Sequence, residues 1–164
     1  MSRVDPVIIE PRLCTELELA TFCKLVLQGG EVEGHGLEQR VKKAKTLVFL
    51  KVNDEVVGVA ALKEPSKTYR DRVFRKASVP NAADPFHLEL GWVYVLPNHQ
   101  GKKYSHIISA AAMSQSERRP TFATTRLDNV AMQRTLDRLA FRRLGDSWRS
   151  DRGQRQRLVL YVTT

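Results

Sequence analysis

The sequence has few of the features that mark secreted or membrane proteins. Its 164 residues contain two cysteines, and no apolar run approaches the roughly 20 residues that cross a bilayer. The first residues, MSRVDPVIIEPR, lack the apolar stretch of a secretory signal. Cys14 and Cys23 lie in a segment expected to be helical, where they point in roughly opposite directions. We therefore expect reduced, packed cysteines, no membrane association and a cytoplasmic location.

Metal ligands and a nucleophile–base pair are also missing. The four histidines show no ligand spacing. His87-x-Glu89 has the spacing of the zinc-deaminase motif, but no P-C-x-x-C follows to complete a zinc site. Ser105 and His106 are neighbours on one predicted helix, where adjacent side chains diverge. The sequence therefore predicts no metal site and no activated serine.

The composition is that of one soluble domain over residues 1–164, with 42% hydrophobic and 27% charged residues. The net charge of +9 is unevenly spread, because residues 63–164 hold 19 basic and 9 acidic groups, a surplus of +10. This basic half favours an anionic partner: a phosphate-rich cofactor, a nucleic acid such as RNA, or an acidic protein. A solvated basic face without a specific partner explains it equally well.

Hydrophobic periodicity predicts an alternation of strands and helices. The best-marked helix begins at the capping box Thr15-x-x-Glu18 and ends at Gly29, and Asn53-Asp54 predicts a two-residue hairpin. The order β-α-α-β-β-β-α-β-α-β-β implies an α/β (α+β) domain with a mixed sheet. The other predicted strands are Val7–Glu10, Thr46–Val52, Glu55–Leu62, His87–Val95, Phe122–Thr125, Ser147–Arg149 and Leu158–Val162, and the other helices are Gly36–Ala44, Gln100–Gln115 and Asn129–Leu139.

Residues 63–86 break this pattern. Three prolines frame the basic stretch Lys67–Lys76, and we expect a long excursion with one short helical turn at most. If the chain binds nucleic acid, the phosphate contacts come from this stretch, through Lys67, Arg70, Arg72, Arg75 and Lys76.

The segment ELGWVYVLPNHQGKKYS, residues 89–105, is a strand that leads through a polar turn into a helix N-terminus. The first turn of a helix leaves N–H groups without backbone partners and carries partial positive charge, so it suits a pyrophosphate. Lys102 and Lys103 add formal charge.

This segment resembles the acetyl-CoA-binding motif of the GNAT N-acetyltransferases, a strand ending in V-x-P followed by Q/R-x-x-G-x-G/A at a helix start. Gln100 matches the first position, Lys103 stands at the first motif glycine, and Ser105 at the second small residue. Lys103 either points outward from a helical backbone or weakens cofactor binding.

A second stretch is similar to the same family. Phe122–Thr125 followed by Asn129, Met132 and Leu136, and the ending Leu139-Ala140-Phe141, resembles the family's strand, N-x-x-A/M helix and L-G-F ending. Ala140 replaces the usual glycine. With the N-terminal helix pair, the hairpin and the final strand, the likeness covers about residues 5–162 in order, and it implies a GNAT-like sheet that is mostly antiparallel.

The resemblance implies acetyl-CoA as the acyl donor and a primary amine as the acceptor. The backbone of the strand pairs with the pantetheine arm, Gly91 permits the bulge that splays the strand, and the turn holds the pyrophosphate. The implied cofactor contacts are Val93, Tyr94, Val95, Gln100, Gly101, Lys102, Lys103, Tyr104, Ser105 and Asn129. Asn129 is equally typical of a helix N-cap.

Glu89 stands at the family's strand carboxylate, so the resemblance implies a general base that acts through a water. An exposed strand glutamate or an ion-pair partner is the alternative. Leu136 occupies the position of the family's tyrosine acid, and Tyr94 and Tyr104 are equally explained as packing residues, so no general acid is assigned. The sequence therefore favours an acyl-CoA-dependent N-acyltransferase that is compatible with a homodimer. The alternative is a nucleic-acid-binding module with the same fold and no acyltransferase activity.

Overall fold

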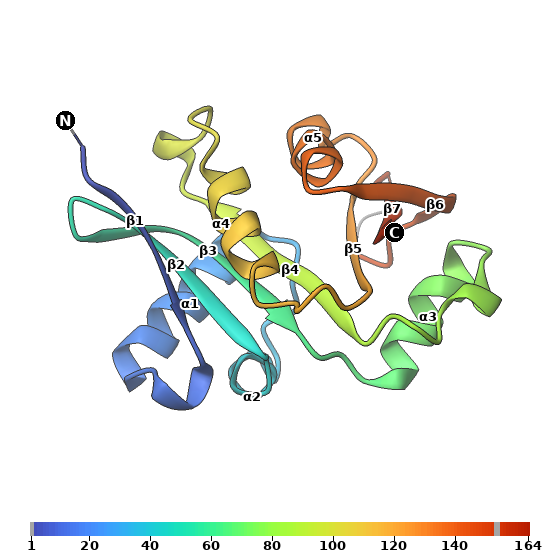
Figure 1. Ribbon diagram of the computed structural model, residues 1–164, viewed down its shortest axis with the longest axis horizontal. Helices are drawn as coiled ribbons and strands as arrows, with labels where there is room; N and C mark the ends of the chain where they lie inside the picture. The colour runs from blue at the N-terminus through green and yellow to red at the C-terminus, as the bar shows by residue number, and fades with distance from the viewer. Residues whose placement is uncertain (1, 153–154) are drawn as a thin grey trace. The chain divides into compact units, whose positions relative to one another are not determined.

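The computed structural model describes residues 2–152 and 155–164 (Figure 1). Its strands are hydrogen-bonded in the order β1-β2-β3-β4-β5-β7-β6, mostly antiparallel, with β4 and β5 parallel and helices flanking them. This confirms the predicted mixed, mostly antiparallel fold. The elements are β1 Val4–Ile9, η1 Pro11–Leu13, α1 Glu16–Gln28, α2 Leu37–Lys42, β2 Thr46–Val52, β3 Glu55–Lys63, α3 Lys67–Lys76, η2 Pro80–Ala82, β4 Leu88–Val95, η3 Pro97–His99, α4 Tyr104–Met113, β5 Thr121–Arg126, α5 Val130–Arg138, β6 Phe141–Arg149 and β7 Arg157–Thr163.

The chain folds into two compact units. The first comprises the residues up to Lys63 together with Leu90–Gln115, and the second comprises Glu64–Glu89 and Ser116–Thr164. The expectation of one domain over residues 1–164 stays a prediction.

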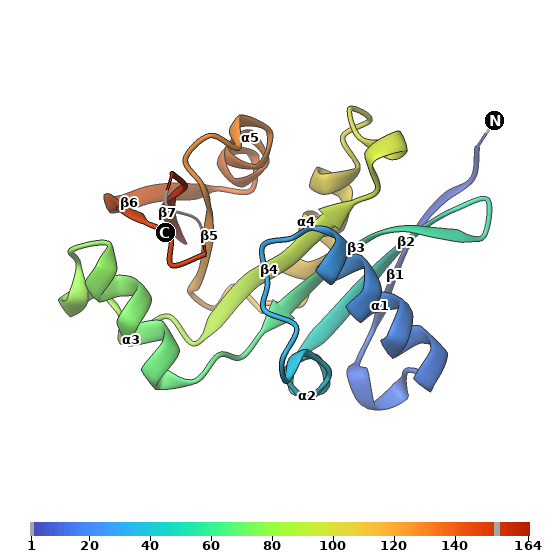
Figure 2. The same cartoon turned by 180° about the vertical axis from the view of Figure 1, so that it is seen from behind.

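In the first unit, strands β1, β2 and β3 carry helices on both faces. Figures 1 and 2 show α1 and α2 on one face and α4 on the other. Side chains alternate along a strand, so Leu47 and Phe49 of β2 join the cluster under α1 and α2, while Val48 and Leu50 point toward the face that α4 covers. Burial on both faces explains why β2 is almost continuously apolar.

The local signals of the first unit are confirmed. The Thr15 hydroxyl accepts from the Glu18 N–H at 3.1 Å and the Glu18 carboxylate accepts from the Thr15 N–H at 2.8 Å, which is the predicted capping box. Asn53 and Asp54 both have left-handed backbones, with φ of 51° and 68°. Two such residues match the right-handed twist of the flanking strands, so the predicted hairpin between β2 and β3 forms.

In the second unit, α3 and α5 lie on opposite faces of β5, β7 and β6 (Figures 1 and 2). Phe74 of α3 stacks on Phe86 and meets the edge of the Phe122 ring, with ring centroids 5.3 and 5.4 Å apart. Trp148 of β6 and Leu160 of β7 complete this cluster.

The helix α3 corrects the expectation of an irregular excursion over residues 63–86. The Ser66 hydroxyl caps its first turn by accepting from the Tyr69 N–H at 3.2 Å. Its buried face is Arg70, Val73, Phe74 and Ala77, which has helical spacing. Because an arginine opens this stripe, only three of its members are apolar, and the periodicity was too weak to predict a helix.

The strand β6 is also longer than the predicted Ser147–Arg149. Its register against β7 shifts between Leu144 and Trp148, where Gly145 has a φ of +73° and the Asp146 N–H donates to the Ala77 carbonyl at 2.9 Å. A bulge interrupts the side-chain alternation on which a strand prediction depends.

Two further findings concern predicted absences. Among the described residues, no helix combines the length and the apolar character needed to cross a bilayer. Cys14 and Cys23 are free thiols, and burial is the main cause that raises the pKa of each.

The bulge in β6 provides a test of the packing in the second unit. A methyl group at Gly145 would overlap the Ala77 carbonyl oxygen and would also stand on a left-handed backbone. We expect Gly145→Ala to lower the free energy of unfolding by about 2–5 kcal/mol in urea denaturation. Gly30→Ala is the matched control, because Gly30 has a φ of +74° and open space around it, and should cost about 1 kcal/mol. Equal losses would contradict the overlap.

Candidate active site

The turn between β4 and α4 has an unusual backbone. Gln100 is extended, Gly101 has a φ of +80° and Lys103 a φ of +63°. The helix therefore begins at Tyr104 rather than at the predicted Gln100. The Gln100 side chain donates from Nε2 to the Val95 carbonyl at 3.0 Å, which ties the turn to the end of β4. The N–H groups of the first turn of α4 follow directly, and such groups have no partner inside a helix.

Lys103 agrees with the first expectation in the orientation of its side chain but not in its backbone. Its side chain is exposed, as an outward orientation requires, but its backbone is left-handed rather than helical. This conformation costs a residue with a Cβ about 1–2 kcal/mol and costs glycine nothing comparable. Lys103 therefore has a backbone conformation that glycine would adopt at lower cost. Lys102 and Ser105 flank it on the same turn, Lys102 exposed and Ser105 half-buried.

A second left-handed residue lies inside β4. It is Trp92, with a φ of 54°, the residue after Gly91, at which the bulge was predicted. A Cβ on Gly91 would approach the Lys63 Cδ to 2.9 Å, so the Lys63 side chain would have to move to admit one. The Lys63 Nζ lies 4.4 Å from the centroid of the Trp92 ring, a cation–π distance. The strand is therefore irregular in the region where the sequence predicted a bulge. The residue with the irregular backbone is Trp92, next to Gly91.

The next residues of β4 differ in burial, and the backbone carbonyl of Val95 already accepts a hydrogen bond. Val93 and Tyr94 are half-buried, whereas Val95 is buried and its carbonyl accepts from Gln100. The Tyr94 side chain packs with the cluster under α1. Tyr104 is buried and stacks against His99 at 6.4 Å between centroids. Both tyrosines are thus in packing positions, one of the two roles foreseen for them.

Glu89 belongs to the second unit and is 3% exposed. The prediction's alternative of an exposed strand glutamate is therefore wrong. Its Oε2 accepts from the Tyr69 hydroxyl at 2.9 Å. Leu88 and Glu89 also form the parallel pairing with Thr121 and Phe122 of β5. Tyr69 was missed from the sequence, because its helix was expected to be a loop.

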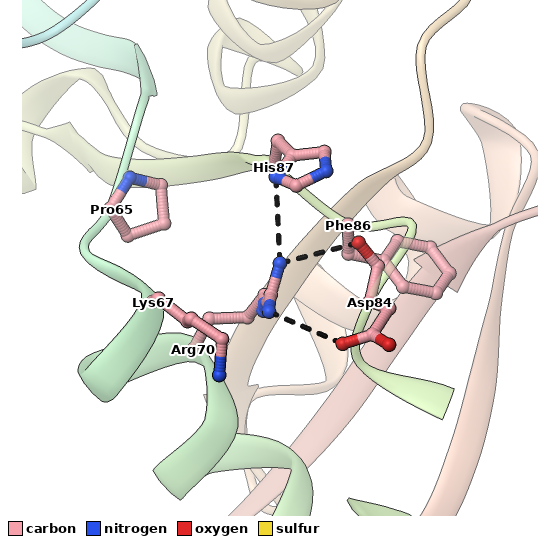
Figure 3. Close-up of a pocket in the computed structure, with 6 residues that line it drawn as sticks. All are labelled: Pro65, Lys67, Arg70, Asp84, Phe86 and His87. Carbon is pink, nitrogen blue, oxygen red and sulfur yellow. Dashed lines mark hydrogen bonds and ion pairs between the residues drawn. The ribbon is translucent and has the colours of Figure 1, made fainter. Parts of the chain in front are cut away.

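The helix that carries Tyr69 is fastened by its neighbour Arg70, which is 4% exposed (Figure 3). The Arg70 Nη1 contacts the Asp84 carbonyl at 3.3 Å and the His87 Nδ1 at 3.4 Å. Its Nε and Nη2 donate to Asp71 at 3.1 and 3.0 Å, and Nη2 lies 3.6 Å from the Asp84 carboxylate. Because arginine only donates, His87 accepts at Nδ1 and carries its proton on Nε2.

A cavity of about 340 Å³ opens beside this cluster in the second unit. Figure 3 shows the Arg70 guanidinium between His87 and Asp84, which line the cavity with it. Each guanidinium nitrogen already has an acceptor, so the cavity does not present a spare cationic group from Arg70. The lining is Pro65, Lys67, Arg70, Asp84, Phe86 and His87.

The basic stretch on α3 is largely neutralised by carboxylates. Lys67 and Arg70 both bond Asp71, and Lys76 bonds Asp151 at 2.5 Å. Arg72 and Arg75 are exposed, and the Arg72 guanidinium lies 5.8 Å from the centroid of the Tyr69 ring. The five predicted phosphate contacts therefore do not form one free cationic surface.

Asn129 and Leu136 have structural roles in the second unit. The Asn129 Oδ1 accepts from the Met132 N–H at 3.1 Å, so the side chain caps α5, as one of the two predicted roles requires. Leu136 is fully buried. Within the part of the chain that the structure describes, no three His, Cys, Asp or Glu side chains come together as a metal site.

Comparison with known proteins identifies a family that matches most of the chain. The family described as Acetyltransferase (GNAT) matches residues 15–141, which include β4, the turn and α5. No curated protein matches the chain.

Solved structures resemble the chain over nearly its full length. ElaA of Escherichia coli is 12% identical, with a TM-score of 0.68 and coverage of 99% of this chain and 100% of the other. The putative acetyltransferase yncA of Salmonella typhimurium, solved with acetyl-CoA, is 15% identical, with a TM-score of 0.66 and coverage of 98% and 93%. Ribosomal-protein-alanine N-acetyltransferase of Brucella melitensis is 17% identical, with a TM-score of 0.66 and coverage of 96% and 98%. At these identities the likeness concerns the fold.

The left-handed backbone at Lys103 predicts opposite effects of glycine at two adjacent positions. Lys103→Gly relieves the steric cost, whereas Lys102→Gly, at a residue without a positive φ, only adds freedom to the unfolded chain. We expect Lys102→Gly to lose about 0.5–1 kcal/mol and Lys103→Gly to lose nothing or to gain up to about 1 kcal/mol, by urea denaturation. Equal destabilisation by both would contradict the assigned backbone.

The stability of the fold should depend on pH through the carboxylate of Asp71, which accepts hydrogen bonds from Lys67 and Arg70. The hydrogen bonds from Lys67 and then Arg70 hold the pKa of the Asp71 carboxyl below its usual range. A lowered pKa in the folded state stabilises the fold above the usual pKa, and this contribution is lost as the pH falls through the folded value. We expect Asp71→Asn to lower Tm at about pH 7, and the difference from the unaltered protein to disappear below about pH 3.

Asp5→Asn is the control for that measurement. Asp5 pairs with Arg3 at 2.7 Å, but both side chains are exposed, at 42% and 73%. Exposed pairs contribute about 0–1 kcal/mol, so Tm should change little at any pH. A pH-independent loss in Asp71→Asn would contradict the role of its charge.

Proposed function

Because the chain belongs to the acetyltransferase (GNAT) family, with a match over residues 15–141, we propose that it transfers the acetyl group of acetyl-CoA to a primary amine. Members of this family use acetyl-CoA as the acyl donor. The observation that supports the proposal most is the turn after β4, where Gly101 and Lys103 take left-handed conformations directly before the N-terminus of α4. Backbones of this kind direct successive N–H groups toward one point, which suits an anion.

The residues of this turn fit a pyrophosphate. Gly101, Lys102 and Lys103 are exposed, and no atom lies within 4 Å of the space that a Cβ on Gly101 would take. An approaching phosphate therefore meets open backbone rather than packed side chains. The Gln100 N–H already donates to the Pro97 carbonyl, so the N–H groups from Gly101 to Ser105 would hold it, and the two lysines would add charge. The ammonium groups remain at the surface and need no desolvation to meet the phosphates.

The strand β4 would hold the rest of the cofactor. We assign the pantetheine arm to the backbone of Val93 and Tyr94, and to the N–H side of Val95, because the Val95 carbonyl already accepts from Gln100. The oxygen of Asn129 caps α5, and its contact with the cofactor stays a prediction. The bound cofactor supplies the activated acyl carbonyl, and the chain orients it and polarises it by backbone N–H groups.

Glu89 is the proposed general base. An amine acceptor is protonated at neutral pH and must lose a proton before it attacks a carbonyl. Glu89 is the carboxylate of β4, and its Oε2 accepts a hydrogen bond from the Tyr69 hydroxyl at 2.9 Å. The departing thiolate takes its proton from the nitrogen or from solvent, so a dedicated acid is not required.

Nucleic-acid binding is the second candidate function. The charge that favours it lies on β6 rather than on α3, because Arg142, Arg143 and Arg149 are exposed on this strand, although the neighbours Arg142 and Arg143 point to opposite faces. Guanidinium groups of this kind hold phosphates in a strongly salt-dependent way. An enzyme that acetylates an acceptor associated with RNA would use both surfaces.

One experiment tests the proposed function. We expect acetyl-CoA at about 100 times its Kd to raise Tm by roughly 5–10 °C, and CoA to do the same but not AMP. Glu89→Gln, which keeps a side-chain oxygen for Tyr69 to donate to, should keep this rise and lower turnover by about 100-fold or more. No rise at millimolar acetyl-CoA, together with salt-sensitive retention of RNA, would reject acyl transfer in favour of nucleic-acid binding.

A further inference from the structure

The face of α1 that points away from the strands of the first unit carries exposed leucines. The opposite face is buried and consists of Leu19, Phe22, Leu25 and Val26. On the outer face, Leu17 is 76% exposed and Leu27 is 45% exposed. With Ala20 and Lys24, which are also exposed, they are spaced by three, four and three residues, so they form one stripe along the helix. Neighbouring exposed apolar side chains of this kind mark an interaction surface.

The middle of this stripe is hollow. A groove of about 620 Å³ lies there, and its lining residues all come from α1: Ala20, Cys23, Lys24, Leu27 and Gln28. The distance at which two helices pack depends on the side chains at the point of contact, and alanine has only a methyl group. A second helix can therefore approach α1 closely at Ala20.

Two opposite charges lie symmetrically about Ala20 on the same outer face. Glu16 is four residues before Ala20 and Lys24 is four residues after it, and both are exposed. Eight residues of helix separate the two side chains by about 12 Å along the axis, too far for an ion pair within one helix. Among the residues that the structure describes, neither has an ion-pair partner.

We propose that this face binds a second copy of the chain, with the two α1 helices antiparallel and crossing at Ala20. In such a pair, a residue before Ala20 faces the residue equally far after Ala20 in the second copy. Glu16 therefore lies opposite Lys24 of the second copy, and Leu17 lies opposite Cys23 of the second copy. A two-fold interface repeats each contact, so two ion pairs and two apolar pairs form. This inference does not depend on the proposed acyl transfer.

Helix packing and charge both favour a second copy over other occupants of this face. The row Glu16, Ala20, Lys24 has the four-residue spacing of the ridges in the commonest class of helix packing. A lipid surface would offer no counter-charge within the stripe, whereas the second copy supplies the opposite charge to both Glu16 and Lys24.

The size of the surface sets the strength of the expected dimer. The helix α1 has 13 residues, so it is about 20 Å long, and a pair of such helices forms a small interface. Interfaces at the low end of the size range belong to weak, reversible complexes. We expect a monomer–dimer equilibrium with a Kd of about 1–100 µM.

Charge reversal tests the pairing, with Kd measured by sedimentation equilibrium from about 5 to about 500 µM protein at about 50 mM salt. Glu16→Lys and Lys24→Glu each place like charges opposite one another twice, so each should raise Kd by at least about tenfold. An equimolar mixture of the two variants should dimerise as tightly as the unaltered chain within about threefold, because every opposed pair in the heterodimer again has opposite charges. Glu16→Lys also places a cation at the positive end of the α1 dipole, but mixing restores an interface and does not repair a folding defect.

Lys43→Glu is the matched control, because it changes the net charge as Lys24→Glu does but lies at the exposed end of α2, outside the proposed interface. Its Kd should stay within about twofold of that of the unaltered chain.

Cross-linking tests where the helices cross. In a chain with Cys14→Ser and Cys23→Ser, Ala20→Cys should form a disulfide-linked dimer on oxidation with copper phenanthroline, since the two copies of residue 20 meet at the two-fold axis. Gln28→Cys is exposed on the same face but should not cross-link. Its two copies would lie about 24 Å apart along the helices, and a disulfide requires Cα atoms within about 7 Å.

Several results would overturn the proposal. An unaltered chain that stays monomeric up to about 500 µM forms no dimer of the expected strength. If that monomer floats with phosphatidylcholine vesicles, the stripe binds a lipid surface instead. A dimer whose Kd is unchanged by both charge reversals uses another surface, and a mixture of the two variants that stays monomeric contradicts the antiparallel pairing.

Discussion

A guanidinium can be buried only where acceptors meet each of its nitrogens, and Arg70 imposes this requirement on the second unit. Its partners come from α3 itself, from the Asp84 carbonyl and carboxylate, and from His87 immediately before β4. A buried ion pair of this kind adds little net stability compared with apolar packing. Losing one partner, however, leaves the other groups buried without compensation and is strongly destabilising. Its value is therefore positional, because it fixes where α3 lies against the start of β4.

The position of Tyr69 follows from this constraint. It precedes Arg70 in the helix, and its hydroxyl meets Glu89, two residues beyond His87. Arg70 fixes the helix against the residue before β4, and the helix and strand geometries then bring the Tyr69 hydroxyl to the Glu89 carboxylate. A segment inserted between two strands of the sheet thereby contributes to the proposed chemistry, although its composition resembles that of a solvated basic loop.

The first unit contributes through backbone conformation rather than through charge pairing. Trp92 inside β4, and Gly101 and Lys103 after it, have left-handed backbones. Two of the three are not glycine, so their conformations carry a cost that other interactions in the fold must offset. Strain of this kind is concentrated at sites that present backbone groups to ligands, which agrees with the cofactor site proposed for the turn.

Sequence alone determined the features whose energetics are local. The capping box at Thr15 and Glu18, the hairpin at Asn53 and Asp54, and the buried run of β2 each depend on residues next to one another in the chain. The motif around Gln100 and the family follow from the same kind of information, and the strand order agrees with it. The start of α4 was misplaced because a left-handed lysine has no signature in a sequence.

Only the tertiary structure decided the features that depend on burial. Arg70 counts as polar in a periodicity pattern, yet it faces the core because acceptors from distant residues compensate its charge. The bulge in β6 forms because the Ala77 carbonyl meets the Asp146 N–H across 69 positions of the chain. Glu89 is buried and bonded to Tyr69 for the same reason, since the free energy of a buried polar group is set by which partners the fold brings to it.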